Sequence, residues 1–481
     1  MEKVKIGLEI HCQLTSLKTK LFCGCSSDYR GKTPNTFVCP VCLGLPGSLP
    51  VLNEKAVELA VMVALALNCE VAPQTFFVRK NYFYPDMPKN FQISQYDVGG
   101  SIAIASGGWV GFLVGKTRKT VRLRRIHLEE DPGKLFYHGT IDTSPYTLVD
   151  YNRAGIALLE IVTEPELEAP AEARAFLQKL RSILEHLGVS DGGLEGAMRC
   201  DANISIEGGG RVEVKNISSF KDVERALTFE IVRQRDLLKK GVKIQTETRH
   251  WDDVRRTTLS LRVKEEEQDY RYFLEPDLTP VRISQEMVEL LRSRMPELPD
   301  ARKERFLKAY GLPEYDAEVL TSDRAMADFF EECAKLYDKP KAVANWLMGD
   351  VLQCLHSLEV DIDQAKLAPQ YLAEMLKLMD RGDISIKIAK KVLWEVMKHG
   401  KSPSTVVREK DWWRITDLQT LEGYIAQVFK EYPKAVEDAL VDEKTIHYLI
   451  GKTMEATGGK ADPELTNALI RKKLSQMKKG S

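Results

Sequence analysis

Residues 5–14 alternate between apolar and polar side chains with a period of two, which predicts a β-strand with two chemically different faces. One face carries the apolar residues Ile6, Leu8, Ile10, Cys12 and Leu14. The other face carries Gly7, Glu9, His11 and Gln13. A carboxylate and an imidazole fixed on one side of a rigid strand suit a divalent cation, because neither group must be ordered when the ion binds. The alternative is the exposed polar face of an antiparallel sheet.

The composition is that of a globular protein. The 481 residues, of which 43% are hydrophobic and 29% charged, predict two to four domains. No apolar run reaches membrane-spanning length, and the charged start is not followed by the apolar stretch of a secretory signal, so we expect a cytoplasmic protein. Nine cysteines in such a chain argue against a disulfide framework.

The net charge of −1 excludes a globally basic nucleic-acid-binding protein, so any such binding must use local patches. Basic residues crowd the strand-like stretch 116–125 and the tail 471–481. Either run could contact phosphates or simply be a solvated surface.

Four cysteines form two close pairs, Cys23-Gly-Cys25 and Cys39-Pro-Val-Cys42. This spacing lets two short loops close tetrahedrally around one zinc ion. Four thiolates leave no open coordination position, so the sequence predicts a structural metal without a catalytic role. The alternative is four unrelated reduced cysteines; the other five are expected to behave as small buried hydrophobic residues.

Helices and strands follow one another in a way that predicts an α+β fold. Helical patterns cover 53–67, 171–187 and 219–240, while short alternating segments between 101 and 215 predict an antiparallel sheet. The loop 79–89 mixes cations, aromatic residues and two prolines, as a nucleotide-binding loop would, although a packed turn would also explain it.

Beyond about residue 291 the pattern becomes helical. Prolines near 296–313 and a break near 400–403 predict three domains, at 1–292, 293–405 and 406–481.

Acidic and basic residues recur together on the polar faces of the predicted strands. The pairs are Glu9 with His11, Glu129 with Glu130, Asp201 with Asn203, and Glu213 with Lys215. Carboxylates that converge repel one another unless a cation lies among them, which favours a bound Mg²⁺. Phosphate chemistry fits such a site, because Mg²⁺ and nearby cations neutralise the charge of a transferring phosphoryl group.

Familiar nucleotide and nucleophile signatures are missing. Gly115-Lys116-Thr117 ends like a phosphate-binding loop, but Val110 stands where that loop needs its first glycine. The glycines at 208–210 are better explained as a hairpin turn. No serine, lysine, cysteine or histidine constellation for covalent catalysis stands out.

Several longer blocks resemble one family, the B subunits of the bacterial tRNA-dependent amidotransferases, across almost the whole chain. These blocks are Gly7-Leu-Glu-Ile-His11, Arg79-Lys-Asn-Tyr-Phe-Tyr-Pro85, Gln92-Ile-Ser-Gln95, His127-Leu-Glu-Glu-Asp131, Arg199-Cys-Asp-Ala-Asn203, Lys215-Asn216, Asp269-Tyr-Arg-Tyr-Phe273 and Asn345-Trp-Leu-Met-Gly349. The resemblance implies a cradle-like catalytic domain, a helical domain and a small helical tail domain that binds tRNA. It also implies a heterotrimer with a glutaminase A subunit and a C subunit.

The resemblance implies a reaction as well: Glu-tRNA(Gln) or Asp-tRNA(Asn) is phosphorylated with ATP and then amidated with ammonia released from glutamine. Glu9, His11 and Glu130, with Glu129 beside it, would hold Mg²⁺, and Asp201 and Glu213 would complete the acidic shell. Lys80, Tyr82 and Lys215 would bind the nucleotide. In the tail, the segments 447–452 and 458–460 resemble the tRNA-binding module of the family.

Two other classes remain open from the residues alone. A non-catalytic zinc-knuckle protein that binds nucleic acid would explain the cysteines but not the acidic strands. A metal-dependent phosphoesterase would explain the acids. The choice between Glu-tRNA(Gln) and Asp-tRNA(Asn), the ammonia route, and the choice between Glu129 and Glu130 as ligand are not determined by the sequence.

Overall fold

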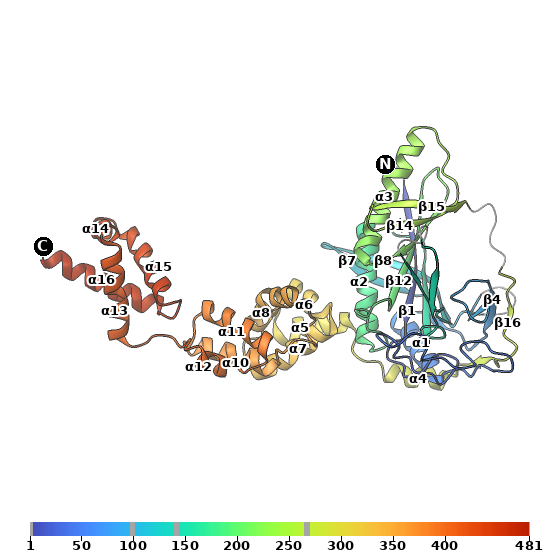
Figure 1. The fold of residues 1–481 in the computed structure, drawn as a ribbon, viewed down its shortest axis with the longest axis horizontal. Coiled ribbons are helices and arrows are strands. Elements are labelled where there is room, and N and C mark those ends of the chain that lie inside the picture. The colour runs from blue at the N-terminus through green and yellow to red at the C-terminus, as the bar shows by residue number, and fades with distance from the viewer. Residues whose placement is uncertain (1–2, 97–101, 139–143, 264–269, 481) are drawn as a thin grey trace. The chain divides into compact units, whose positions relative to one another are not determined.

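The computed structural model describes residues 3–96, 102–138, 144–263 and 270–480, and Figure 1 shows the fold. The chain forms two compact units, residues 1–301 and 302–481. Each unit is described by itself.

A ten-stranded sheet organises the described part of the first unit. Its path is β15-β14-β13-β12-β1-β11-β8-β6-β2, and β7 pairs with β8. The strands are β1 (Val4–Gln13), β2 (Glu70–Val71), β6 (Ala105–Ser106), β7 (Trp109–Val114), β8 (Thr117–Glu130), β11 (Ala157–Thr163), β12 (Met198–Ile206), β13 (Val212–Ile217), β14 (Glu247–Asp252) and β15 (Thr257–Val263). The predicted strand at residues 5–14 is therefore confirmed as β1, in the interior of the sheet.

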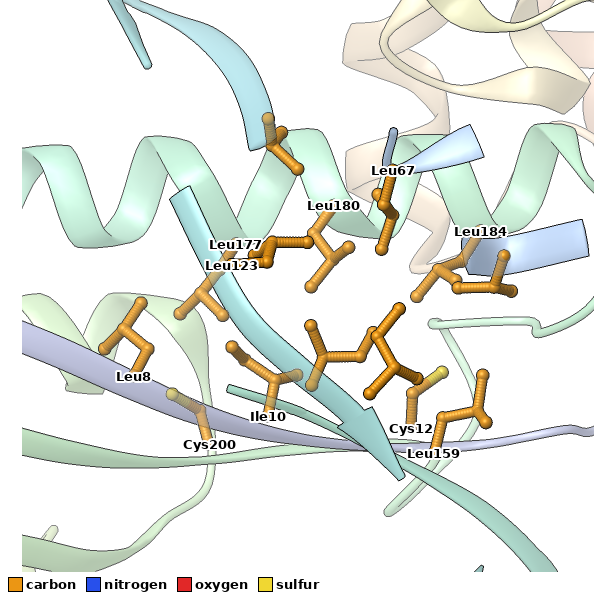
Figure 2. Close-up of a cluster of buried hydrophobic side chains, with 14 of the residues drawn as sticks. Leu8, Ile10, Cys12, Leu67, Leu123, Leu159, Leu177, Leu180, Leu184 and Cys200 are labelled. Atoms are coloured by element: carbon orange, nitrogen blue, oxygen red, sulfur yellow. The ribbon is translucent and has the colours of Figure 1, made fainter. Parts of the chain in front are cut away.

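The apolar face of this sheet forms the main hydrophobic core (Figure 2). Leu8, Ile10 and Cys12 of β1 lie beside Leu159 and Cys200 of the two flanking strands, and all are at most 3% exposed. Leu177, Leu180 and Leu184 of helix α2 (Pro170–His186) pack over them. The alternation of β1 thus leaves its polar residues on the opposite side of the sheet.

The predicted helices of the first unit are confirmed. Helix α1 (Glu54–Ala66) begins after Asn53, whose side chain accepts a hydrogen bond from the amide of Lys55. Helix α3 (Phe220–Lys239) begins after Ser219, which caps the amide of Asp222. Helix α4 (Gln285–Ser293) closes the unit.

The sheet is mixed, which corrects the prediction of an antiparallel sheet. β13 and β14 run parallel, whereas the other neighbouring pairs of the described sheet are antiparallel. The reason is the connection between them, because the crossover through α3 returns the chain to the same end of the sheet. The glycines at 208–210 do form the predicted turn between β12 and β13, and a side chain at Gly210 would meet the carbonyl oxygen of Ile244 at 2.7 Å.

Several short strands lie among the loops around the sheet. They are β3 (Gln74–Thr75), β4 (Val78–Asn81), β5 (Phe91–Ser94), β9 (Lys134–Tyr137), β10 (Thr147–Asp150), β16 (Phe273–Leu274) and β17 (Val281–Arg282). β4 pairs with both β5 and β16. The segment 79–89 therefore starts as a strand and becomes irregular only after Asn81, so the predicted loop is shorter than expected.

The second unit is helical. Its elements are α5 (Pro299–Tyr310), which begins at the end of the first unit, α6 (Glu314–Thr321), α7 (Arg324–Leu336), α8 (Pro340–Trp346), the π-helix η1 (Leu347–Val351), α9 (Leu352–Leu358), α10 (Pro369–Asp380), α11 (Ile386–His399), α12 (Pro403–Glu409), α13 (Leu418–Glu431), α14 (Pro433–Val441), the 3₁₀-helix η2 (Glu443–Thr445), α15 (Ile446–Ala456) and α16 (Pro463–Gly480). The described residues of this unit form two hydrophobic clusters, within 306–407 and within 421–474. The boundary predicted at 405 falls near the gap between these clusters and stays a prediction.

None of the helices that the structure describes has the length and apolar character needed to cross a membrane. Four of the five cysteines outside the paired set are buried as expected, and Cys354 is half-buried.

Candidate functional site

A histidine and three carboxylates meet on the polar face of the main sheet. The Nε2 atom of His11 lies 3.7 Å from Glu9 Oε1, 3.8 Å from Glu129 Oε1 and 3.8 Å from Glu160 Oε2. One ligand atom each from Glu9, His11 and Glu160 can be placed within 4.8 Å of one another, close enough to share a metal ion. The side chains of Glu129 and Glu160 are 3% and 9% exposed, whereas those of His11 and Glu9 are 19% and 29% exposed, so the cluster is buried on one side and reachable from solvent on the other.

The strand register explains how residues distant in sequence meet. Glu160 of β11 lies directly opposite His11 of β1, and on its other side it faces His127 of β8. Glu129 lies two residues beyond His127 and therefore on the same face. The imidazole of His127 is 3.5 Å from Glu160 Oε1. Antiparallel pairing thus assembles the cluster from three strands.

The crowding of these charges shifts their pKa values in opposite directions. Burial, together with the charge of Glu160, raises the pKa of both Glu9 and Glu129. Burial alone would also raise the pKa of Glu160, but hydrogen bonding to His127 and the charges of His11 and Lys80 lower it instead. Carboxylates that resist ionising together need a cation between them, so these residues fit a divalent ion.

Glu130 lies elsewhere. Consecutive residues of β8 point to opposite sides of the strand, and Glu130 forms an ion pair with Lys89 and accepts a hydrogen bond from the amide of Ile93 at 2.9 Å. Glu129, whose Oε2 accepts from Ser94 Oγ at 2.6 Å, is the member of the pair that faces His11. The structure therefore does not bring Glu130 to Glu9 and His11, contrary to the expected set of Mg²⁺ ligands.

Asp201 and Glu213 extend the acidic face on the other side of β1. Asp201 lies opposite Glu9 in the sheet. Lys215 Nζ is 2.7 Å from Asp201 Oδ2 and 3.0 Å from Glu213 Oε1. These two predicted acidic residues are thus held by a lysine, and they lie next to the carboxylate and imidazole cluster.

A cavity of about 480 Å³ opens beside Lys215. It is lined by Lys80, Tyr82, Tyr84, Lys215, Thr248, Leu261 and Tyr270. The three residues expected to bind a nucleotide, Lys80, Tyr82 and Lys215, therefore share one cavity. Burial alone would lower the pKa of Lys80, but the nearby carboxylates of Glu129 and Glu160 raise it, so its ammonium carries its charge at neutral pH.

The paired cysteines converge as predicted. Sγ atoms of Cys23, Cys25, Cys39 and Cys42 lie within 4.8 Å of one another, which suits four-thiolate coordination of one ion. Hydrogen bonding with Cys23 lowers the pKa of the Cys42 thiol to about 4, and the ammonium of Lys20 contributes in the same direction. The donor set therefore fits a zinc ion.

The basic stretch 116–125 is largely neutralised within the chain. Lys119, Arg122 and Arg124 form ion pairs with Glu172, Glu166 and Glu164. Arg125 lies 3.5 Å from Glu160. This pairing favours the interpretation of the stretch as a solvated surface.

Sequence reasoning missed Glu160. A usable signal was present, because Glu160 is the single charged residue in the apolar run 157–162 of a strand, where an uncompensated charge is costly. His127, the partner of Glu160, belongs to the resembling block 127–131 and has no signal of its own in the sequence. Two residues of the resembling blocks are not characterised, since Asp269 lies outside the described residues and the side chain of Asn216 is not described.

Comparison with known proteins finds matches to one family over nearly the full chain. Residues 4–289 match the family model described as the GatB/GatE catalytic domain, and residues 328–474 match the GatB domain. The B subunit of the aspartyl/glutamyl-tRNA(Asn/Gln) amidotransferase from Sulfurisphaera tokodaii is 56% identical over 98% of this chain and 99% of its own length. The protein of the same name from Thermotoga maritima is 50% identical over 98% of each chain. The chain therefore belongs to the family of aspartyl/glutamyl-tRNA(Asn/Gln) amidotransferase B subunits.

Proposed function

We propose that this chain is the subunit of a tRNA-dependent amidotransferase that activates the side-chain carboxylate of Glu-tRNA(Gln), Asp-tRNA(Asn) or both and converts it to an amide. The names of its full-length relatives support this activity. The observation that carries the assignment of the site is the meeting of Glu9, His11 and Glu160 around a point that one cation can occupy.

The reaction needs ATP for a chemical reason. A carboxylate is a poor electrophile, because displacement by ammonia would have to expel an oxide. Phosphorylation turns that oxygen into a phosphate leaving group, and ammonia then attacks the acyl carbon and releases phosphate. A fixed array of charges is well suited to the first step, since it neutralises the phosphoryl oxygens without reorganising.

Glu9, His11 and Glu160 would hold Mg²⁺, with Glu129 closing the same side of the sheet. When bound, the ion would neutralise negative charge on the phosphate oxygens. Asp201 and Glu213 would orient Lys215 through the ion pairs described above.

Lys80 and Lys215, which line the same cavity, would bind the phosphates of ATP. Tyr82 and Tyr270 line the cavity as well, and the Lys80 ammonium lies 5.0 Å from the centre of the Tyr270 ring. A cation held against an aromatic ring in this way keeps its charge while remaining shielded from water.

Ammonia would come from glutamine hydrolysed by a glutaminase A subunit, with a small C subunit bracing the pair. Free ammonia is mostly protonated in neutral water and then cannot act as a nucleophile. Delivery through a closed passage between subunits would keep it reactive. The four cysteines would hold a structural Zn²⁺ that takes no part in this chemistry.

The helical tail, 406–481, would contact the tRNA body as a separate third domain. Lys472 and Lys478 are exposed on α16, where they can reach phosphates. Lys452 and Lys460 of the resembling segments form ion pairs within the chain, with Glu455 and Asp411. Lys472 and Lys478 are therefore the stronger candidates for phosphate contacts. Ser481, the last residue of the predicted basic tail, lies outside the described residues.

The test is Glu9→Gln in the complex reconstituted with its partner subunits. We expect ATP cleavage dependent on misacylated tRNA to be abolished while the complex still assembles, because the substitution keeps the shape and removes the charge. Glu207→Gln, at an exposed glutamate just after β12, is the matched control and should keep full activity. Unchanged ATP turnover in Glu9→Gln would refute the assigned site, and assay of both misacylated tRNAs identifies the substrate.

A further inference from the structure

Lys20 is a fully buried cation beside the four-cysteine cluster. Its relative exposure is 0%, and its Nζ atom lies 3.6 Å from Cys42 Sγ and 3.4 Å from the carbonyl oxygen of Tyr151. Among the residues that the structure describes, no carboxylate lies within 4.0 Å of this ammonium. A buried charge is strongly unfavourable unless nearby groups compensate it, and the two acceptors in contact with this ammonium are the carbonyl oxygen of Tyr151 and the sulfur of Cys42, of which only the sulfur can carry a negative charge.

The backbone around Lys20 is built to hold this contact. The amide of Lys20 donates to the carbonyl oxygen of Cys25 at 2.9 Å, which ties the lysine to the first cysteine pair. Gly155 lies against the other side, with φ of +88°, and a Cβ there would lie 3.4 Å from Lys20 Cδ and 3.5 Å from Cys42 Cβ. A Cβ at these distances would make ordinary van der Waals contacts, so it is the positive φ that favours glycine at position 155, and the lysine stem and Cys42 pack against it.

A divalent ion bound by four thiolates leaves the site with excess negative charge, which a nearby cation can offset. Four thiolates bring more negative charge than one divalent ion neutralises, and the excess must be offset by hydrogen-bond donors or cations around the sulfurs. Cys42 Sγ is placed to accept from two donors, the amide of Cys39 at 3.2 Å and the ammonium of Lys20. Cys42 is also the buried member of the cluster, where compensation of charge is needed most.

We propose that Lys20 is the internal countercation of the four-cysteine metal site, a positioning residue whose ammonium donates to the Cys42 thiolate and strengthens zinc binding. The lysine and the metal then depend on each other: the bound ion keeps Cys42 as a thiolate, and that thiolate supplies the counterion that the buried lysine needs. This role is independent of the proposed amidotransferase activity.

The test compares Lys20→Met with Lys18→Met in the full-length chain. Methionine keeps the length and apolar stem of lysine, and Lys18 is an exposed lysine in the same loop. Zinc affinity is measured by competition with a chromogenic chelator, and Co²⁺ is used as a spectroscopic probe of the thiolates. We expect Lys20→Met to bind zinc about 10-fold to 100-fold more weakly and to shift the thiolate-to-cobalt band. Lys18→Met should match the unaltered protein. Equal zinc affinity and an unchanged cobalt spectrum in Lys20→Met would overturn the proposal.

A second comparison separates the charge from simple packing and serves even if Lys20→Met folds poorly. In the Cys42→Ser background the thiolate is gone and Lys20 has lost its counterion. Lys20→Met should then raise the urea midpoint of Cys42→Ser, or leave it unchanged, although it lowers the midpoint of the unaltered protein. If Lys20→Met lowers both midpoints equally, the lysine acts by packing alone and the proposal is wrong.

Discussion

Replacing Glu160 with glutamine tests the geometry of the candidate metal site most directly, because the sequence did not single out this residue. Glu160 Oε2 lies 3.8 Å from His11 Nε2, and its side chain is only 9% exposed. Glutamine fills the same space and retains one carbonyl oxygen, but it carries no charge. The substitution therefore removes one anionic ligand from a site formed by Glu9, His11 and Glu160.

The size of the effect follows from the number of ligands. Loss of a partner outside the first coordination sphere already weakens metal binding about 10-fold to 100-fold. Loss of one of three protein ligands should cost at least as much, or about 1.4 to 2.8 kcal/mol of binding free energy. The charge of Glu160 also raises the pKa values of Glu9 and Glu129, so both pKa values should fall in the variant. With lower pKa values, Glu9 and Glu129 are more fully ionised and bind the metal better, which recovers part of the lost binding free energy.

The assay is calorimetric titration of the full-length chain with Mn²⁺, together with the Mg²⁺ dependence of ATP turnover in the reconstituted complex. Glu160→Gln should need about 10-fold to 100-fold more metal and recover part of its turnover when metal is abundant. Glu164→Gln, at a glutamate paired with Arg124 one residue beyond β11, is the matched control and should behave normally. The reasoning is refuted if Glu160→Gln binds metal as tightly as the control.

Three further outcomes are expected. Lys215→Met should raise the KM for ATP about 10-fold or more in steady-state assays, because a hydrogen bond to a charged group contributes about 1.5 to 3 kcal/mol; an unchanged KM would place the phosphates elsewhere. Asp131→Asn should cost about 1.5 to 3 kcal/mol in urea unfolding at neutral pH, since it removes the charge of a buried carboxylate that pairs at 2.6 Å with the partly exposed Arg199. Burial alone would raise the pKa of Asp131, but the charge of Arg199 lowers it. The stabilisation is therefore present above the unfolded-state pKa of about 3.9 and is lost as the pH falls below that value. A cost that does not change with pH would contradict this explanation. Leu180→Ala, at a fully buried position of α2, should lower the stability of the first unit by about 2 to 5 kcal/mol, measured by amide hydrogen exchange in β1. A loss below about 1 kcal/mol would show that the core repacks around the smaller side chain.

Much of the local structure followed from patterns of short range. The alternation at 5–14 predicted β1 and both of its faces, because side-chain direction in a strand depends only on the parity of the position. The caps at Asn53 and Ser219 predicted where α1 and α3 begin, since an N-cap side chain bonds amides two or three residues away. The spacing of the cysteine pairs was informative because it too depends only on residues that are close together in the chain.

The site needed more than local patterns. Glu9 and His11 were candidates from their own strand, but Glu160 joins them only because β11 pairs with β1 in one particular register. The choice between Glu129 and Glu130 was open for the same reason: the parity of β8 separates the two residues, yet only the pairing of β8 with β11 shows which of them faces His11.

The amino-acid sequence by itself determined which elements form, which face of each is apolar, and which residue types could bind metal and phosphate. Tertiary structure decided which of those residues share a site, because the register of β1 with β11 places His11 opposite Glu160, far away in the chain, and the crossover through α3 places β14 beside β13. It also decided that Lys20 would be buried against Cys42, a contact set by how the cysteine loop packs on Gly155. No periodicity of either segment encodes that contact, since it depends on the shape of a surface that exists only in the folded chain.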